Sequence, residues 1–186
     1  MQQEFTLTIF SENRIGMLNQ ITTVFTRRHI NIESLSTSES AIEGIHKFTI
    51  VIFSTREAVD VLVRQIEKRI DVLKAYSFTQ DEIVYQEIAL YKVPTAALLE
   101  GNEIENLVRR YGARILEITP EYTVIEKTGH KLETQELFNK LDIYGVTQFT
   151  RSGRIAINKL KKEPLNNYLR KLEKNGVNPD TYKTNK

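Results

Sequence analysis

The stretch EFTLTIFSENRIGMLNQITTVFTRR, residues 4–28, decides the start of the fold because its apolar residues change period within a few positions. Its first part alternates apolar and polar residues, which is typical of a strand with one buried face. Its last part has the three- and four-residue apolar spacing of an amphipathic helix. The apolar positions are Phe5, Leu7 and Ile9 in the strand, and Leu18, Ile21, Val24 and Phe25 in the helix. The polar loop SENRIG, residues 11–16, joins these two elements.

The next residues predict two more strands, a second helix and a final strand. NIESLSTSES, residues 31–40, and IHKFTIVIF, residues 45–53, are strand candidates, and the glycine of the intervening AIEG favours a hairpin. Ser54 followed by Glu57 is a capping-box pattern, which predicts a helix start there. The apolar stripe of that helix is Val59, Leu62, Val63, Ile66 and Ile70. With DVLKAYSF, residues 71–78, as the last strand, the first half has the order βαββαβ.

The second half repeats this order. Residues 82–93, 113–119, 121–129 and 146–158 are strand or hairpin candidates, and residues 102–112 and 131–145 are helix candidates. We therefore predict an α+β protein with two ferredoxin-like βαββαβ domains, over residues 1–80 and 81–158. Residues 159–186 form a basic tail that we expect to be partly helical or disordered, with Leu165, Leu169 and Leu172 on one helix face.

Composition and charge restrict the class of protein. Apolar residues make up 40% of the chain and charged residues 27%, enough for a folded core. The absence of cysteine excludes disulfides, thiolate zinc sites and cysteine nucleophiles, and favours a reducing cytoplasm. No stretch has the length of a membrane span, and the start lacks a signal-peptide pattern, so we expect a cytoplasmic protein without membrane contact.

Basic residues are concentrated in the tail and not on a folded face. Lys and Arg against Asp and Glu number 9 and 9 in residues 1–80, and 8 and 3 in residues 159–186. This distribution does not predict a nucleic-acid partner, since nucleic-acid binders usually spread cations over a folded surface.

The loop between the first strand and the first helix is the main candidate binding site. The first backbone amides of a helix lack partners and attract anions, so Gly16, Met17 and Leu18 could hold a carboxylate. Asn13 lies beside them in sequence, and Asn31 could bring a second amide to the same edge if the two strands were adjacent. The same pattern is also common in ordinary turns, where Asn13 and Gly16 would only shape the backbone.

Other chemistry is poorly supported by the sequence. His29, His46 and His130 have no metal-ligand spacing to other residues, so no metal is expected. No paired acids, nucleophile or cofactor loop stand out, which argues against a small enzyme and against a bound cofactor.

The stretch ENRIGMLNQITTVFTRRHINIESL, residues 12–35, resembles the start of the small regulatory subunits of acetolactate synthase (acetohydroxyacid synthase). RQIEKRIDVLKAYSF, EIALYKV, RILEITPEYTVIEKTGHKLETQELF and RSGRIAI resemble later parts of that family, so the resemblance covers residues 4–158. His29, the short hairpin and residues 159–186 depart from the family pattern.

This resemblance implies a first domain of the ACT type, which binds a small amino acid at a homodimer interface, and a second domain that activates a catalytic large subunit. It implies a non-catalytic protein that confers feedback inhibition by valine, or by leucine or isoleucine, on a thiamine-diphosphate enzyme. The implied effector-binding residues are Asn13, Gly16, Met17, Leu18, Asn31 and Ile32. A free-standing amino-acid-sensing regulator of transcription stays open as the alternative, with the basic tail as its only sequence support.

Overall fold

The computed structural model describes residues 1–161, 165, 166 and 168–170. The chain forms two compact units, the first made of Met1–Val84 with the chain from Ala156 onward, and the second made of Tyr85–Ile155. The sequence predicted a domain boundary between residues 80 and 81 and a separate tail from residue 159. Helical residues 165, 166 and 168–170 of that tail belong to the first unit, whereas Leu172 lies outside the described residues.

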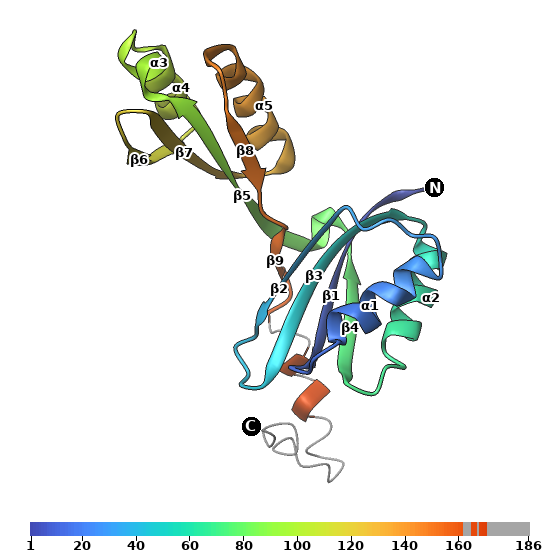
Figure 1. The fold of residues 1–186 in the computed structure, drawn as a ribbon. Coiled ribbons are helices and arrows are strands. Elements are labelled where there is room, and N and C mark those ends of the chain that lie inside the picture. Colours follow the sequence, from blue (N-terminus) through green and yellow to red (C-terminus); the bar gives the residue numbers. More distant parts are fainter. Residues whose placement is uncertain (162–164, 167, 171–186) are drawn as a thin grey trace. The chain divides into compact units, whose positions relative to one another are not determined.

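The first unit is a four-stranded antiparallel sheet with two helices on one face (Figure 1). The sheet order is β2-β3-β1-β4, so β3 lies between β1 and β2. Its elements are β1 (Gln3–Glu12), α1 (Met17–Thr26), β2 (Ser34–Glu39), β3 (Ile45–Ser54), α2 (Arg56–Ile66) and β4 (Val72–Phe78). This is the predicted βαββαβ order.

The main core of this unit lies between the helices and the sheet. It contains the predicted strand positions Phe5, Leu7 and Ile9. Two predicted helix positions are wrong, since Leu18 is 46% exposed and Ile70 is 98% exposed. Met17 is buried instead of Leu18, because α1 begins at Met17 and this residue lies on the helix face that packs against the sheet.

The capping box predicted from Ser54 and Glu57 is also wrong. Thr55 is the N-cap of α2, and its hydroxyl accepts a hydrogen bond from the Ala58 amide at 3.4 Å. Ser54 is instead the last residue of β3, where it pairs with Gln3 of β1. The strand extends one residue further than the sequence pattern indicated, so the cap shifts by one position.

The end of α1 has a Schellman motif with a histidine where glycine is usual. The Ile30 amide donates to the Phe25 carbonyl at 3.1 Å, and the His29 amide donates to the Thr26 carbonyl at 3.0 Å. His29 has φ 53°, and it is the only residue other than glycine with a positive φ among the described residues. This turn sends Ile30 back into the core.

A second, smaller apolar cluster in the first unit includes the tail. Leu165 is fully buried against Phe10, Ile45 and Leu73. Phe10 belongs to β1, but its alternation places it on the opposite side from Ile9. Leu165, together with Tyr168 and Leu169, therefore covers part of the sheet face that the helices leave open.

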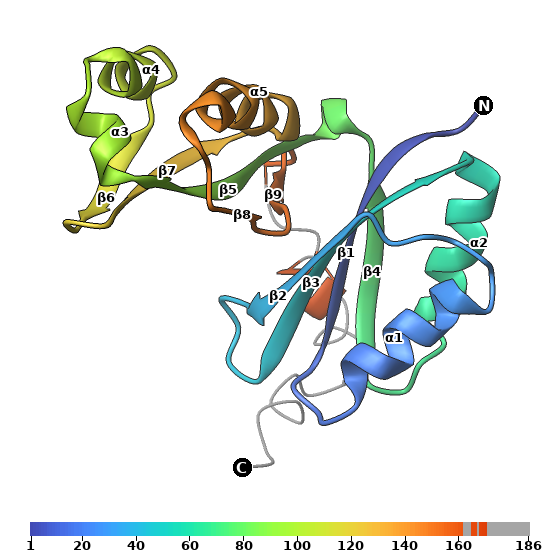
Figure 2. The same ribbon diagram turned by 45° about the horizontal axis from the view of Figure 1, so that its top comes forward.

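The second unit repeats the arrangement with one additional helix and a divided last strand (Figure 2). Its sheet has the order β6-β7-β5-β8, and β9 also pairs with β5. The elements are β5 (Ile83–Pro94), α3 (Thr95–Leu99), α4 (Glu103–Arg110), β6 (Arg114–Ile118), β7 (Tyr122–Gly129), α5 (Lys131–Leu141) and β8 (Gln148–Arg151). The short β9 (Ile155–Asn158) completes the sheet, and only its first residue belongs to the second unit. Both units are thus ferredoxin-like, as predicted. No helix in the described residues is long and apolar enough to cross a bilayer.

Candidate functional site

The loop between β1 and α1 has a fixed backbone. Arg14 links this loop to the ends of the neighbouring strands, because its Nε lies 2.7 Å from Glu12 Oε2 and 3.4 Å from Asp71 Oδ1. The Asn13 amide donates to the Gly44 carbonyl at 3.0 Å, which ties the loop to the β2–β3 hairpin. Gly16 has φ 88°, a conformation that side chains of L residues rarely adopt, so a glycine suits this position.

Helix α1 begins without a side chain that satisfies its positive end. Gly16 is its N-cap, and the first turn contains no acidic residue. The Met17 amide donates to the Arg14 carbonyl at 3.3 Å, and the Gln20 amide makes the first helical bond, to Gly16. The amides of Leu18 and Asn19 therefore remain for another acceptor. The structure leaves this helix start suited to an anion.

The other helices of at least eight residues start differently. Helix α2 has the Thr55 cap and Glu57 in its first turn, and α4 has Glu103 and Glu105. In α5, Glu133 accepts from the His130 amide at 2.6 Å. Among the described helices of this length, α1 alone lacks an acidic residue in its first turn.

The predicted site residues do not all come together within one chain. Asn13 and Gly16 are exposed beside the start of α1, whereas the Met17 side chain is buried in the core and only its backbone faces the loop. Leu18 is half-exposed on the next position. These four residues form one continuous surface feature at the end of β1.

Asn31 and Ile32 lie at the opposite end of the sheet. Ser34, the first residue of β2, pairs with Val51, which in turn pairs with Thr6 near the start of β1. Asn13 follows the end of β1, which is roughly 20 Å away at about 3.3 Å per residue. The condition for bringing Asn13 and Asn31 to one edge, that the first two strands are adjacent, is therefore not met within a single chain, because β3 separates β1 from β2.

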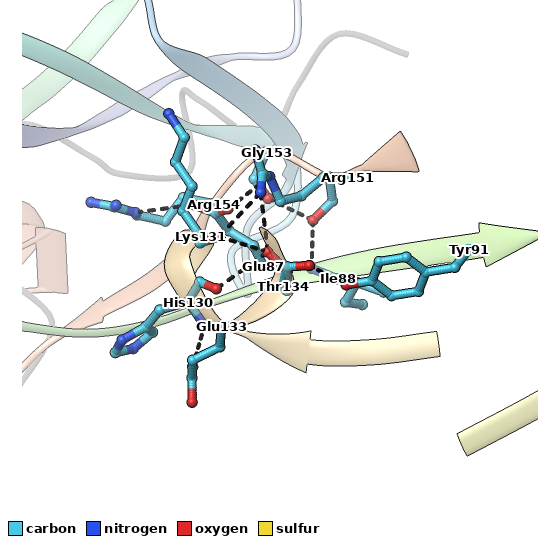
Figure 3. Close-up of polar contacts among 11 residues, drawn as sticks. Glu87, Ile88, Tyr91, His130, Lys131, Glu133, Thr134, Arg151, Gly153 and Arg154 are labelled. Carbon is cyan, nitrogen blue, oxygen red and sulfur yellow. Dashed lines mark hydrogen bonds and ion pairs between the residues drawn. The ribbon is translucent and has the colours of Figure 1, made fainter. Parts of the chain in front are cut away.

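The second unit has a different feature, a buried group of charges at the start of β5 (Figure 3). Glu87 is 5% exposed and lies 3.4 Å from Arg151 Nε and 3.9 Å from Arg154 Nε. The Arg154 guanidinium lies 3.7 Å from the centroid of the Tyr85 ring, and Tyr85 stacks on His130 at 4.3 Å. Sequence reasoning missed this cluster, since its members come from three separate segments.

Hydrogen bonds connect this cluster to the core of the second unit. Arg151 Nη1 donates to Thr134 Oγ1 at 3.1 Å, and the Tyr91 hydroxyl donates to the Thr134 carbonyl at 2.6 Å. Burial raises the pKa of Tyr91, while the charge of Arg151 acts in the opposite direction. The cluster thus fixes β8 and the start of α5 against β5, and its chemistry is structural. Among the described residues, no group of His, Asp and Glu could hold a metal ion.

The open sheet face of the second unit has a hollow of about 450 Å³. Lys92 and Tyr122 meet on this face, with the ammonium 3.9 Å from the ring centroid. The lining residues are Leu90, Tyr91, Lys92, Glu117, Tyr122, Val124, Gln148, Phe149 and Thr150. This mixed apolar and polar surface is a candidate contact for another protein.

Comparison with known proteins identifies the family. The model of the small subunit of acetolactate synthase matches residues 86–160, and the AHAS small subunit-like ACT domain matches residues 7–74. The acetolactate synthase small subunit of Bacillus subtilis is 34% identical over 157 residues, which cover 84% of this chain and 90% of that protein. The chain belongs to the acetolactate synthase small-subunit family.

Two further likenesses agree with this assignment to the small-subunit family. The small subunit of Mycolicibacterium smegmatis is 29% identical over 83% of this chain and 90% of its own length. The crystal structure of the acetolactate synthase small subunit from Thermotoga maritima has a TM-score of 0.78 and 25% identity, with 86% of this chain and 99% of that chain covered. The family recognised from the sequence, and its ACT domain, are thus confirmed.

Proposed function

We propose that this small subunit is a non-catalytic regulatory protein that activates a catalytic large subunit of acetolactate synthase and confers feedback inhibition by valine. Family membership and the unsatisfied start of α1 support this proposal, and the helix start carries the ligand part of it. The partner would be a cytoplasmic thiamine-diphosphate enzyme, which supplies the carbon–carbon bond chemistry that this chain has no residues to perform.

The effector site in this proposal lies between two copies of the chain. The carboxylate of valine accepts hydrogen bonds from the amides of Leu18 and Asn19 in one copy, with Asn13 and Gly16 beside it. Asn31 and Ile32 come from the second copy, because they lie at the opposite end of the sheet in the same chain. A two-fold axis between the copies places one end of the first sheet beside the opposite end of the second. The dimer therefore contains two equivalent sites, each with Asn13 from one copy and Asn31 from the other.

The edge of the first sheet supports such a dimer. Within the described part of the chain, strand β2 has only β3 as a neighbour, so its outer edge can pair with the β2 of a second copy. Pairing two such edges also removes an exposed strand edge, which would otherwise promote uncontrolled association.

Activation belongs to the second unit in this proposal. The start of α4 carries two acids and therefore does not suit a carboxylate ligand. The open sheet face with Leu90, Lys92 and Gln148 is instead available for the catalytic subunit.

Reconstitution with the catalytic subunit tests both parts. We expect the isolated chain to form no acetolactate, and the mixture to form it faster than the catalytic subunit alone and to be inhibited by valine. Asn31→Ala should retain stimulation and resist valine. An Asn31→Ala variant that is inhibited as strongly as the wild type would contradict the effector site.

A matched pair of substitutions tests the second unit. Gln148→Arg places a cation in the hollow of the sheet face, whereas Gln135→Arg makes the same change on helix α5. We expect only Gln148→Arg to reduce stimulation. If both variants stimulate like the wild type, this sheet face is not the activating surface.

A further inference from the structure

The first unit contains a cavity of about 620 Å³ with an unusual lining of basic residues. It lies where the ends of α1 and α2 come together. The lining residues are Val24, Arg27, Arg28, His29, Gln65, Lys68 and Arg69. None of them is acidic, so the wall of the cavity carries four permanent positive charges and a histidine.

The cations of this cavity have no carboxylate partner among the residues that the structure describes. Across residues 1–161, 165, 166 and 168–170, none of the four forms an ion pair, whereas Arg14, Arg56 and Lys74 of the same unit each pair with a carboxylate. Arg28 Nε donates to Gln65 Oε1 at 2.5 Å, which fixes its guanidinium at the wall. Arg69 Nε is buried and has no hydrogen-bond partner among the described residues.

Helix ends alone do not explain this arrangement. Cations near a helix C-terminus interact favourably with its dipole, and α1 and α2 both end here. A cation in that role normally extends into water, as Arg109 does in the last turn of α4 with 79% of its side chain exposed. The dipole does not account for four cations gathered around one open cavity, or for the buried Arg69 Nε without an acceptor among the described residues.

We propose that this cavity binds a small anion with several phosphate groups. Its volume is in the range of pockets for small ligands. Guanidinium groups bind phosphate oxygens in pairs, and four clustered cations match a polyanion better than a single carboxylate. The cavity lies at the other end of α1 from Gly16, about 15 Å away for a helix of this length. It is therefore a second site, separate from the amino-acid site.

Calorimetric titration of the full chain with sodium triphosphate, pyrophosphate and inorganic phosphate tests the proposal, at a constant salt concentration of about 150 mM. We expect saturable binding that strengthens with the number of phosphate groups. The double variant Arg27→Gln/Lys68→Gln should weaken triphosphate binding at least about tenfold, since each charged hydrogen bond contributes that much or more.

Two controls separate this site from general charge effects. Arg109→Gln/Arg110→Gln removes the same charge from a helix end in the second unit, and Gly16→Asp alters the other end of α1. Both should bind triphosphate like the wild type. Equal losses in the two double variants, loss in Gly16→Asp, or no saturable binding would each overturn the proposal. The proposal is also overturned if the double variant Arg27→Gln/Lys68→Gln binds triphosphate like the wild type but no longer binds the catalytic subunit. The cations would then contact an acidic protein surface.

Discussion

Replacement of Gly16 by Asp should greatly weaken valine binding in a protein that still folds. A Cβ at Gly16 would meet no atom within 4 Å, so the cost to the fold comes from φ 88° alone. This conformation costs an L residue about 1–2 kcal/mol, and Asp adopts it more readily than most. The new carboxylate can accept from the first-turn amides, although it does so from a backbone that is not the usual extended N-cap conformation.

The effect on binding comes from repulsion between two carboxylates. At about 4 Å, two negative charges repel by about 1 kcal/mol in water and by about 4 kcal/mol near a protein surface. Valine affinity should therefore fall between about 5-fold and 1,000-fold. Gly16→Asn is the matched control, since it has the same size and the same backbone requirement but no charge.

Calorimetry with valine, leucine and isoleucine, together with circular dichroism for the fold, measures this difference. We expect Gly16→Asn to bind more tightly than Gly16→Asp. The reasoning is refuted if Gly16→Asp is folded and binds valine like the wild type. It is also refuted if both variants lose the same affinity, because charge would then not be the cause.

Three further predictions concern stability. His29→Gly should stabilise the first unit by about 0.5–1 kcal/mol in denaturant titrations, and Gly112→His should destabilise the second, because both positions follow a helix at positive φ. Glu126 has a lowered pKa, through its hydrogen bond from Thr128 and then its contact with Arg114, so it stabilises the fold above its ordinary pKa of 4.5. The difference in unfolding free energy between wild type and Glu126→Gln should therefore shrink as the pH falls below that value, and a constant difference would contradict this. Leu165→Asp should lower stability by about 1.5–3 kcal/mol and increase binding of an apolar dye, whereas the exposed Asn166→Asp should change neither.

The sequence predicted helices and strands well where one face of the element is buried. It predicted them poorly where contacts with a neighbouring segment determine the end of an element. Phe5, Leu7 and Ile9 alternate because β1 lies under the helices, and this signal is local. The choice between Ser54 and Thr55 as helix cap depends on how far β3 pairs with β1, which the local pattern does not contain. Helix α3 was missed for a related reason, since five residues are too few to establish an apolar period.

The candidate sites also differ in how far their residues lie apart in the sequence. Asn13, Gly16 and Leu18 lie within six residues, so their common loop could be recognised from the chain alone. Asn31 could be placed beside this loop only on the condition that the first two strands are adjacent, because its position depends on the strand order, which is not a local property. The basic cavity brings together two segments about 40 residues apart, and each segment alone reads as an ordinary basic helix end.

In the proposed function, the charge at a helix start helps to separate the roles of the two units. Helix α1 begins at a glycine with no acid in its first turn, whereas in the second unit the five-residue α3 follows the first strand and the next helix, α4, carries Glu103 and Glu105 in its first turn. A carboxylate ligand is attracted by the first arrangement and repelled by the second, although both helices have the same positive backbone end. In this proposal the start of α4 does not compete for an acidic effector, and the open sheet face of the second unit binds the partner without coupling to effector binding in the same unit. Any link between effector and partner must then pass through a change in how the copies or units associate, with a coupling free energy of about 1–3 kcal/mol being sufficient.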